Sequence, residues 1–210
     1  TFCEAPPGSG LGSSSTIVVS IIKALADYLS VALDDYEIAR IAFIVEREDC
    51  QLQGGKQDQY AAAFGGFNYM EFKKDGNVLV NPLRIKNWIK CELESSLVLF
   101  FTSISRDSEK IIKDQVKNVR KNSEDTIEAF HKIKKSSMHM KESLLKGNFQ
   151  EFGNHLRLGW EEKVKTADSV SNKIINKIYL ESINAGAVSG KLSGAGGGGF
   201  MMLYVPTEKR

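Results

Sequence analysis

Residues 5–15 read Ala-Pro-Pro-Gly-Ser-Gly-Leu-Gly-Ser-Ser-Ser, and their chemistry is the strongest pointer to the fold. The two prolines exclude a helix at this point, whereas the alternating glycines allow a tight backbone path. Apolar residues at helical spacing follow over Thr16–Ser30, and the three serines before them are expected to cap that helix. Free N–H groups and the helix dipole attract phosphate at such a junction. The alternative is a flexible turn that only caps the helix.

Outward from this loop, the first half of the chain alternates short helical and extended patterns. Thr1–Glu4 is interpreted as the end of a strand that enters the loop. Helical patterns are predicted over Asp34–Asp49, with Asp34 or Asp35 as its cap, and over Gln57–Phe64. An Asp75-Gly76 turn between alternating residues predicts a hairpin of Phe67–Phe72 and Val78–Val80.

The second half is richer in lysine and in helix. The apolar run Leu97–Phe101 is expected to form a buried strand. Helices are predicted over residues 107–146 with a break near Asn122-Ser123, over Phe149–Thr166 and over Lys173–Ala185, and strands over Val188–Leu192 and Phe200–Val205. The chain is therefore expected to be an α+β protein with a domain boundary between Pro82 and Ser96.

Composition limits the partners. Hydrophobic residues make up 42% and charged residues 26% of the 210 residues, which fits a packed core. The balance of 28 basic and 26 acidic residues argues against nucleic acid or a membrane surface as the main partner. No secretory pattern is found in Thr1–Ser15, and the three scattered cysteines fit a reducing compartment. We therefore expect a cytoplasmic protein.

A second glycine cluster lies near the end of the chain, between the last two predicted strands. It contains Gly194, Gly196, Gly197, Gly198 and Gly199. Four successive glycines are more than a turn between strands requires, and ordered glycine is entropically costly. The cluster is therefore expected to pack beside the first loop and to let its backbone approach a ligand. The alternative is a turn that contacts no ligand.

These two clusters, in this order, resemble the phosphate-binding and C-terminal glycine-rich motifs of the GHMP kinases. The segment Gly54-Gly55-Lys56-Gln57-Asp58-Gln59-Tyr60 is similar to their catalytic segment. Together with Asn81-Pro82-Leu83-Arg84 and Phe101-Thr102, it most resembles members that phosphorylate D-glycero-D-manno-heptose 7-phosphate. The resemblance spans nearly the whole chain.

The resemblance implies the GHMP kinase two-domain fold. Residues 1–92 would form the N-terminal, ATP-binding part, which is similar to domain 2 of ribosomal protein S5, and residues 93–210 a ferredoxin-like C-terminal domain. Family members carry further strands before the phosphate loop, and nothing here corresponds to them. The N-terminal part is thus expected to be incomplete, and this chain alone is expected to lack a complete active site.

The resemblance also implies an enzyme, a phosphotransferase that moves the ATP γ-phosphate to the anomeric hydroxyl of the heptose. The 1,7-bisphosphate product would lead to nucleotide-activated heptose for surface polysaccharide. The alternatives are another small-molecule kinase of the mevalonate, galactose or fucose type, and a nucleotide-binding regulator without transfer activity. The expected partners are ATP, magnesium and a sugar phosphate, while the oligomeric state stays open.

The catalytic residues implied are Asp58, which would accept or orient the acceptor proton, and Lys56, whose charge would steer a phosphate. The alternatives are a helix N-cap for Asp58 and a solvated surface lysine for Lys56. Magnesium would be held by Ser14 and Glu46, because this hard cation prefers oxygen ligands. An exposed glutamate at a charged helix end is the alternative for Glu46, and Glu48 and Asp49 compete with it.

The resemblance assigns the remaining candidate residues to two groups. ATP would be bound by Pro7, Gly8, Ser9, Gly10, Leu11, Gly12, Ser13 and Ser14. The sugar substrate would be bound by Thr102, Arg106, Gly194, Ala195, Gly196 and Gly197. The 7-phosphate of that substrate requires a cationic partner, for which Arg106, Arg84 and Lys191 are the candidates.

Overall fold

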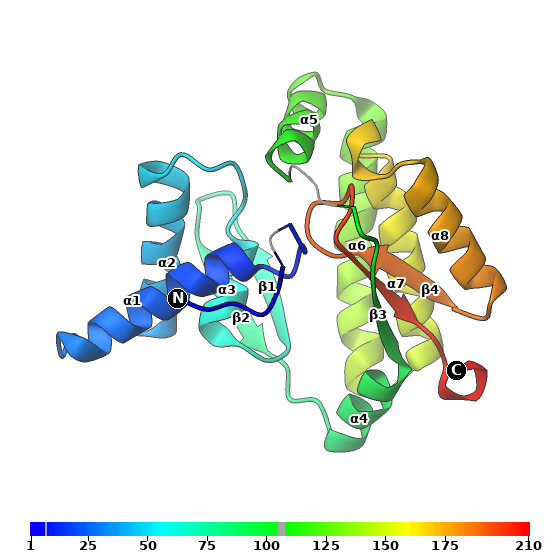
Figure 1. The fold of residues 1–210 in the computed structure, drawn as a ribbon, viewed down its shortest axis with the longest axis horizontal. Coiled ribbons are helices and arrows are strands. Elements are labelled where there is room, and N and C mark those ends of the chain that lie inside the picture. Colours follow the sequence, from blue (N-terminus) through cyan, green and yellow to red (C-terminus); the bar gives the residue numbers. More distant parts are fainter. Residues whose placement is uncertain (7, 105–107) are drawn as a thin grey trace. The chain divides into compact units, whose positions relative to one another are not determined.

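The computed structural model describes residues 1–6, 8–104 and 108–210, and the chain divides into two compact units (Figure 1). The first unit comprises Thr1–Pro6 and Gly12–Arg84, and the second comprises Pro7–Leu11 and Ile85–Arg210. The predicted phosphate loop is therefore divided, because its middle part is assigned to the second unit, whereas its first two residues and the part from Gly12 onward are assigned to the first.

The first unit consists of helices and one hairpin. In chain order it contains α1 (Ser13–Tyr28), α2 (Asp35–Phe43), the π-helix η1 (Ile44–Asp49), α3 (Gln57–Phe64), β1 (Asn68–Phe72) and β2 (Val78–Pro82). The two strands pair antiparallel with Met70 opposite Val80, and Gly76 in the connecting turn has a φ of 87°. The helix after the phosphate loop, the helix Gln57–Phe64 and the Asp75-Gly76 hairpin are thus confirmed.

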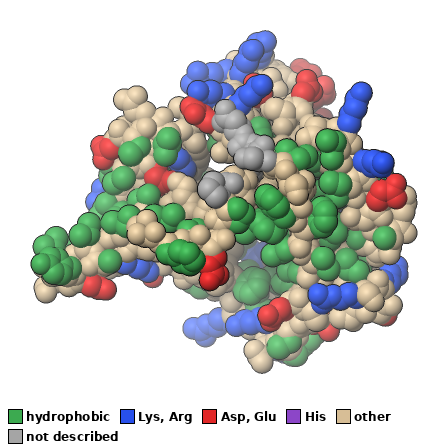
Figure 2. Space-filling view, viewed as in Figure 1, with side chains coloured by type: hydrophobic (Ala, Val, Ile, Leu, Met, Phe, Trp, Pro, Cys, Tyr) green, Lys and Arg blue, Asp and Glu red, His purple; other side chains and the backbone are tan. Residues whose placement is uncertain are grey.

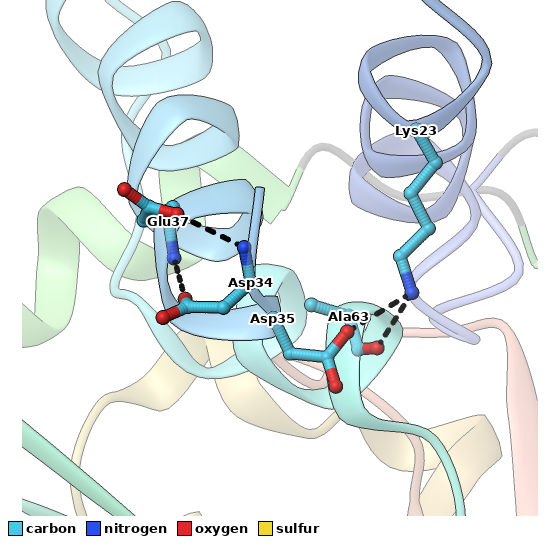
Figure 3. Close-up of polar contacts among 5 residues, drawn as sticks. All are labelled: Lys23, Asp34, Asp35, Glu37 and Ala63. Atoms are coloured by element: carbon cyan, nitrogen blue, oxygen red, sulfur yellow. Dashed lines mark hydrogen bonds and ion pairs between the residues drawn. The ribbon is translucent and has the colours of Figure 1, made fainter. Parts of the chain in front are cut away.

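Local polar contacts fix how the helices of this unit begin and meet. Asp34 caps α2, since its carboxylate accepts the Glu37 N–H at 2.8 Å while the Glu37 carboxylate accepts the Asp34 N–H at 2.9 Å (Figure 3). From α1, Lys23 reaches both Asp35 and the carbonyl of Ala63, the latter in α3 (Figure 3). The buried core between these elements is formed by Val19, Ile38, Ala39, Ala42, Tyr60, Ala63 and Val80.

The second unit contains a three-stranded antiparallel sheet in the order β3-β5-β4. Its elements are α4 (Asn87–Ser96), β3 (Leu97–Phe101), α5 (Ser108–Arg120), α6 (Glu124–Lys146), α7 (Phe149–Val164), η2 (Asp168–Val170), α8 (Lys173–Asn184), β4 (Ser189–Leu192), β5 (Phe200–Tyr204) and η3 (Thr207–Lys209). Trp160, Ile175, Leu192 and Met201 lie in its core, so α7, α8, β4 and β5 bury a common apolar surface.

The structure differs from the predicted secondary structure in several places. Thr1–Glu4 has no strand structure, and the segment Asn87–Ser96 forms the unpredicted helix α4, which buries only Ile89, Leu93 and Ser96. The strand Leu97–Phe101 exists, but it lies at the sheet edge and Leu99 is 57% exposed. An apolar run alone cannot distinguish an edge strand from a central one, because that depends on pairing with distant residues.

The apolar stripe of α1 is only partly buried. Leu25, Tyr28 and Leu29 near its C-terminal end are exposed, and Figure 2 shows apolar side chains gathered along this helix. Within the described residues, no helix combines the length and the apolar character that crossing a bilayer requires. The exposed apolar residues of α1 therefore do not mark a membrane-spanning helix.

Candidate active site

Three glycines of the phosphate loop adopt backbone conformations that other residues rarely adopt. Gly8, Gly10 and Gly12 have φ values of 74°, 78° and 74°, in the left-handed region that L side chains rarely adopt. Gly12 is the N-cap of α1 and provides no side-chain cap, so the expected serine cap is wrong. The three serines lie in the first helical turn instead, where their hydroxyls are free to contact groups from elsewhere. Pro7, predicted to contact ATP, lies outside the described residues.

Two of these hydroxyls bind the carboxylate of Glu46. Ser14 Oγ donates to Glu46 Oε1 at 3.0 Å, and Ser15 Oγ donates to Oε2 at 2.7 Å. A third donor, Gln59 Nε2 from α3, also binds Oε2. Glu46 is only 2% exposed, so it is not the exposed helix-end glutamate that the alternative assumed. Its neighbours Glu48 and Asp49 are exposed.

A π-helix places this carboxylate. The second predicted helix changes from α to π geometry at Ile44, and Glu46 lies within the widened segment Ile44–Asp49. Such segments are rare and occur frequently at functional sites. The prediction of one regular helix up to Asp49 was therefore wrong in its last part, and the difference affects the turn that carries Glu46.

The residues around Glu46 fit a magnesium ion. With metal–oxygen bonds of about 2.0–2.1 Å, neighbouring oxygens of an octahedron are about 2.9 Å apart. The 3.0 Å between Ser14 Oγ and Glu46 Oε1 is an ordinary hydrogen-bond length and is also compatible with that spacing. Gln59 Oε1 is buried beside this carboxylate without a hydrogen-bond partner among the described residues. Because the described chain brings no cluster of three His, Cys, Asp or Glu side chains together, phosphate oxygens and water would complete the coordination.

Asp58 lies beside the phosphate loop. A Cβ placed on Gly12 would lie 3.9 Å from Asp58 Cγ, so the carboxylate approaches the backbone at the start of α1. The N-cap of α3 is Lys56, and Asp58 is the second residue of the helix. The N-cap alternative for Asp58 is therefore wrong, and the side chain is exposed. A carboxylate at this position can contact a hydroxyl of a ligand bound at the loop.

Lys56 is directed to the hairpin turn. Its Nζ donates to the Gly76 carbonyl at 2.6 Å and lies 5.0 Å from the centre of the Phe43 ring. The ammonium thus has a backbone acceptor and an aromatic face as partners. Its participation in catalysis stays a prediction.

The second glycine cluster packs against the first, as expected. The Phe200 N–H donates to Ser9 O at 3.0 Å, and Ser9 is fully buried. A Cβ on Gly199 would lie 2.4 Å from Ser9 O, and one on Gly198 would lie 2.4 Å from Ile104 O. Backbone packing alone therefore requires glycine at both positions.

The substrate candidates of this region also have structural partners. The N–H and hydroxyl of Thr102 both donate to Gly199 O, at 3.0 and 2.8 Å. The Gly197 N–H donates to Val170 O at 2.7 Å, and a Cβ on Gly196 would lie 2.6 Å from the same oxygen. These contacts hold the glycine-rich loop in one conformation. Its contact with a substrate stays a prediction.

The other candidates occupy different surroundings. Ala195 packs against the core of the second unit, and the carbonyl of Gly194 accepts a hydrogen bond from Lys163 Nζ on α7. Among the three candidate phosphate-binding cations, Arg84 is exposed and Arg106 lies outside the described residues. Lys191 lies on β4, and burial lowers the pKa of its amine.

Sequence reasoning missed two residues of the Glu46 cluster. Ser15 is 2% exposed and Gln59 is fully buried, and both bind Glu46 Oε2. The signal for Gln59 was its position on α3, next to Tyr60 and four residues before Ala63, both of which are buried. A polar residue on the buried face of a short helix indicates a specific partner.

Comparison with known proteins identifies relatives of this chain among the GHMP kinases. Residues 2–66 match the GHMP kinase N-terminal domain and residues 140–210 match the GHMP kinase C-terminal domain. The chain is 49% identical over all its 210 residues to a D-glycero-alpha-D-manno-heptose 7-phosphate kinase of Campylobacter jejuni, of which it covers 61%. A Bacteroides thetaiotaomicron D-glycero-D-manno-heptose 1-phosphate kinase structure superposes with a TM-score of 0.77 and 46% identity, over 99% of this chain and 56% of that one.

A more distant relative is an L-fucokinase/L-fucose-1-P guanylyltransferase of Bacteroides fragilis, 28% identical over 94% of this chain and 21% of its own. The chain thus spans less than two thirds of the length of these relatives. The two family matches, in the expected order, confirm the resemblance and the mixed helix-and-sheet fold that it implied. The chain belongs to the GHMP kinase family.

Proposed function

We propose that the protein transfers the γ-phosphate of ATP to the anomeric hydroxyl of D-glycero-D-manno-heptose 7-phosphate, giving the 1,7-bisphosphate. The heptose specificity is supported by the 49% identity to a heptose 7-phosphate kinase across the whole chain. The chemistry is supported by one observation above all: a buried carboxylate, Glu46, binds two hydroxyls from the first turn of α1, directly after the phosphate loop. We further propose an ATP-binding domain over residues 1–92 and a second domain over residues 93–210.

The proposed mechanism assigns binding to the loop and proton handling to Asp58. The amides of the loop and of the first turn of α1 bind the triphosphate, because both the N–H groups and the helix dipole favour negative charge. Ser14 and Glu46 would hold Mg²⁺, which would neutralise charge on the phosphates. Asp58 accepts the proton of the anomeric hydroxyl as the bond from that oxygen to the γ-phosphorus forms and the bond to the ADP oxygen breaks.

An acceptor panel tests the proposal with full-length protein. ADP formation is measured with Mg²⁺, ATP and either heptose 7-phosphate, mannose 6-phosphate, galactose or mevalonate. The expected result is turnover with the heptose phosphate and little with the other three. Turnover on another acceptor would contradict the heptose assignment but retain the kinase. ATP binding without turnover on any acceptor would favour the regulator.

A further inference from the structure

Gln59 contacts the Glu46 carboxylate from α3. It is the third residue of that helix and is fully buried. Its Nε2 and the Ser15 hydroxyl both donate to Oε2, whereas Oε1 accepts from the Ser14 hydroxyl. A carboxylate offers about two acceptor directions at each oxygen. Oε2 is therefore fully used by protein donors, and Oε1 retains one direction for a ligand.

The orientation of the Gln59 amide follows from this arrangement. A flipped amide would place its oxygen against Glu46 Oε2, and two acceptors in contact repel each other. The donor nitrogen therefore faces Glu46, which leaves Gln59 Oε1 buried and without a hydrogen-bond partner among the described residues. A buried acceptor without a donor reduces stability, and such groups in native structures call for an explanation. The amide is therefore oriented for the Glu46 carboxylate, at the expense of its own oxygen.

The same turn of α3 also carries Asp58. Consecutive residues of an α-helix point about 100° apart, so neighbours serve different sides. Asp58 is exposed and lies beside Gly12, while Gln59 is directed inward to Glu46. One turn of α3 therefore positions the Asp58 carboxylate beside the loop and orients the buried Glu46 carboxylate.

We propose that Gln59 is a positioning residue of the magnesium site: it occupies Oε2 of Glu46, so that Oε1 beside Ser14 faces the metal. This role rests on the proposed function. Gln59 is not a metal ligand in this scheme, and it acts through Glu46. Partners of this kind orient metal ligands, and their loss typically costs about 10–100-fold in metal affinity or activity.

The test measures metal binding without turnover. Free Mn²⁺ is followed by its EPR signal while the full-length protein is titrated in the presence of a non-hydrolysable ATP analogue. Gln59→Met keeps the side-chain length but removes donor and acceptor, and the matched control is Gln57→Met at the exposed first position of the same helix. We expect Mn²⁺ affinity to fall about tenfold in Gln59→Met and less than twofold in the control. Affinity for the analogue in EDTA should change less than twofold in both.

Two outcomes would overturn the role of Gln59. Mn²⁺ affinity equal to wild type in Gln59→Met would show that the amide does not orient Glu46. If Gln59→Met lost as much affinity for the ATP analogue in EDTA as it lost for Mn²⁺, Gln59 would have a general structural role instead. If circular dichroism shows that Gln59→Met is unfolded, Gln59→Asn is measured in its place and judged by the same criteria. Asparagine keeps the polar amide, but its side chain is one methylene shorter and should not reach Glu46 Oε2. Wild-type protein whose analogue affinity does not depend on Mn²⁺ would overturn the proposed function as well.

Discussion

Replacing Gly199 by alanine tests whether the two glycine-rich loops pack as described. Gly199 has a φ of 86°, and the added Cβ would lie 2.4 Å from Ser9 O, 2.8 Å from Ser9 C and 3.0 Å from Gly8 O. All three atoms belong to backbone, so no flexible side chain can move aside. The Thr102 hydroxyl and N–H hold the Gly199 carbonyl from the other direction. The substitution must therefore displace one of the loops.

The expected cost follows from two contributions. An L residue in the left-handed region costs about 1–2 kcal/mol, and overpacking against backbone about 1–3 kcal/mol. The lower entropy of the unfolded alanine chain offsets about 0.4–1 kcal/mol of this. The free energy of unfolding should thus fall by about 1–4.6 kcal/mol, which raises the ratio of unfolded to folded protein roughly 5- to 2,000-fold.

Urea unfolding provides the assay. Trp160 is 4% exposed in the core of the second unit, and its fluorescence reports the loss of that core. The control is Gly159→Ala, because Gly159 lies within α7 and an added Cβ meets nothing within 4 Å. Alanine is the better helix former, so this control should gain about 0.5–1 kcal/mol.

A free energy of unfolding of Gly199→Ala within about 0.5 kcal/mol of wild type would contradict this close packing of the two loops. It would mean that the loops do not approach as closely as the contacts with Ser9 indicate. The opposite signs expected for the two Gly→Ala variants exclude a general effect of alanine on the unfolded chain.

Four further predictions concern single side chains. Asp58→Asn should lower kcat about 10²–10⁴-fold in the ADP-release assay with nucleotide affinity unchanged, and a loss below tenfold would argue against a proton-accepting role. Glu46→Gln should raise the Mg²⁺ concentration for half-maximal activity at least about tenfold, and an unchanged Mg²⁺ dependence would contradict the assignment. Thr166→Val should lower the free energy of unfolding by about 1–3 kcal/mol, because the fully buried hydroxyl accepts from Gln115 and donates to Lys163 O, at 2.7 Å each. Burial lowers the pKa of the Lys191 amine in the folded protein. Between that lowered pKa and the unfolded value near 10.5, folding requires the amine to lose its proton, so the free energy of unfolding rises with pH across this range. Lys191→Met should therefore be more stable than wild type at pH 7 by thermal unfolding, with a difference that shrinks toward pH 10.5.

Elements with strong local signals could be predicted from the sequence. α3 ends at Phe64, just before Gly65, and the hairpin turns at Asp75-Gly76, because periodicity and turn residues act within a few positions. The change to π geometry at Ile44 has no such local signal. The exposure of Leu99 on β3 depends on which strands pair, and pairing is a long-range property.

The site was predictable only in part for the same reason. Ser14 and Glu46 are 32 positions apart, and their proximity was expected from the family resemblance and not from spacing. Gln59 and Ser15 also donate to the Glu46 carboxylate. Their roles could not be predicted, because the sequence does not show that Glu46 is buried next to them. The second glycine cluster was interpreted as a ligand-binding feature, whereas the structure also requires Gly198 and Gly199 for backbone packing.

Phosphorus NMR of the product tests whether phosphate is transferred to the anomeric oxygen with Asp58 as proton acceptor. Full-length protein, ATP, Mg²⁺ and D-glycero-D-manno-heptose 7-phosphate should give one new phosphorus signal coupled to the anomeric proton, together with ADP. The signal should be nearly absent with Asp58→Asn. A new phosphate on another carbon, or an undiminished signal with Asp58→Asn, would contradict the account.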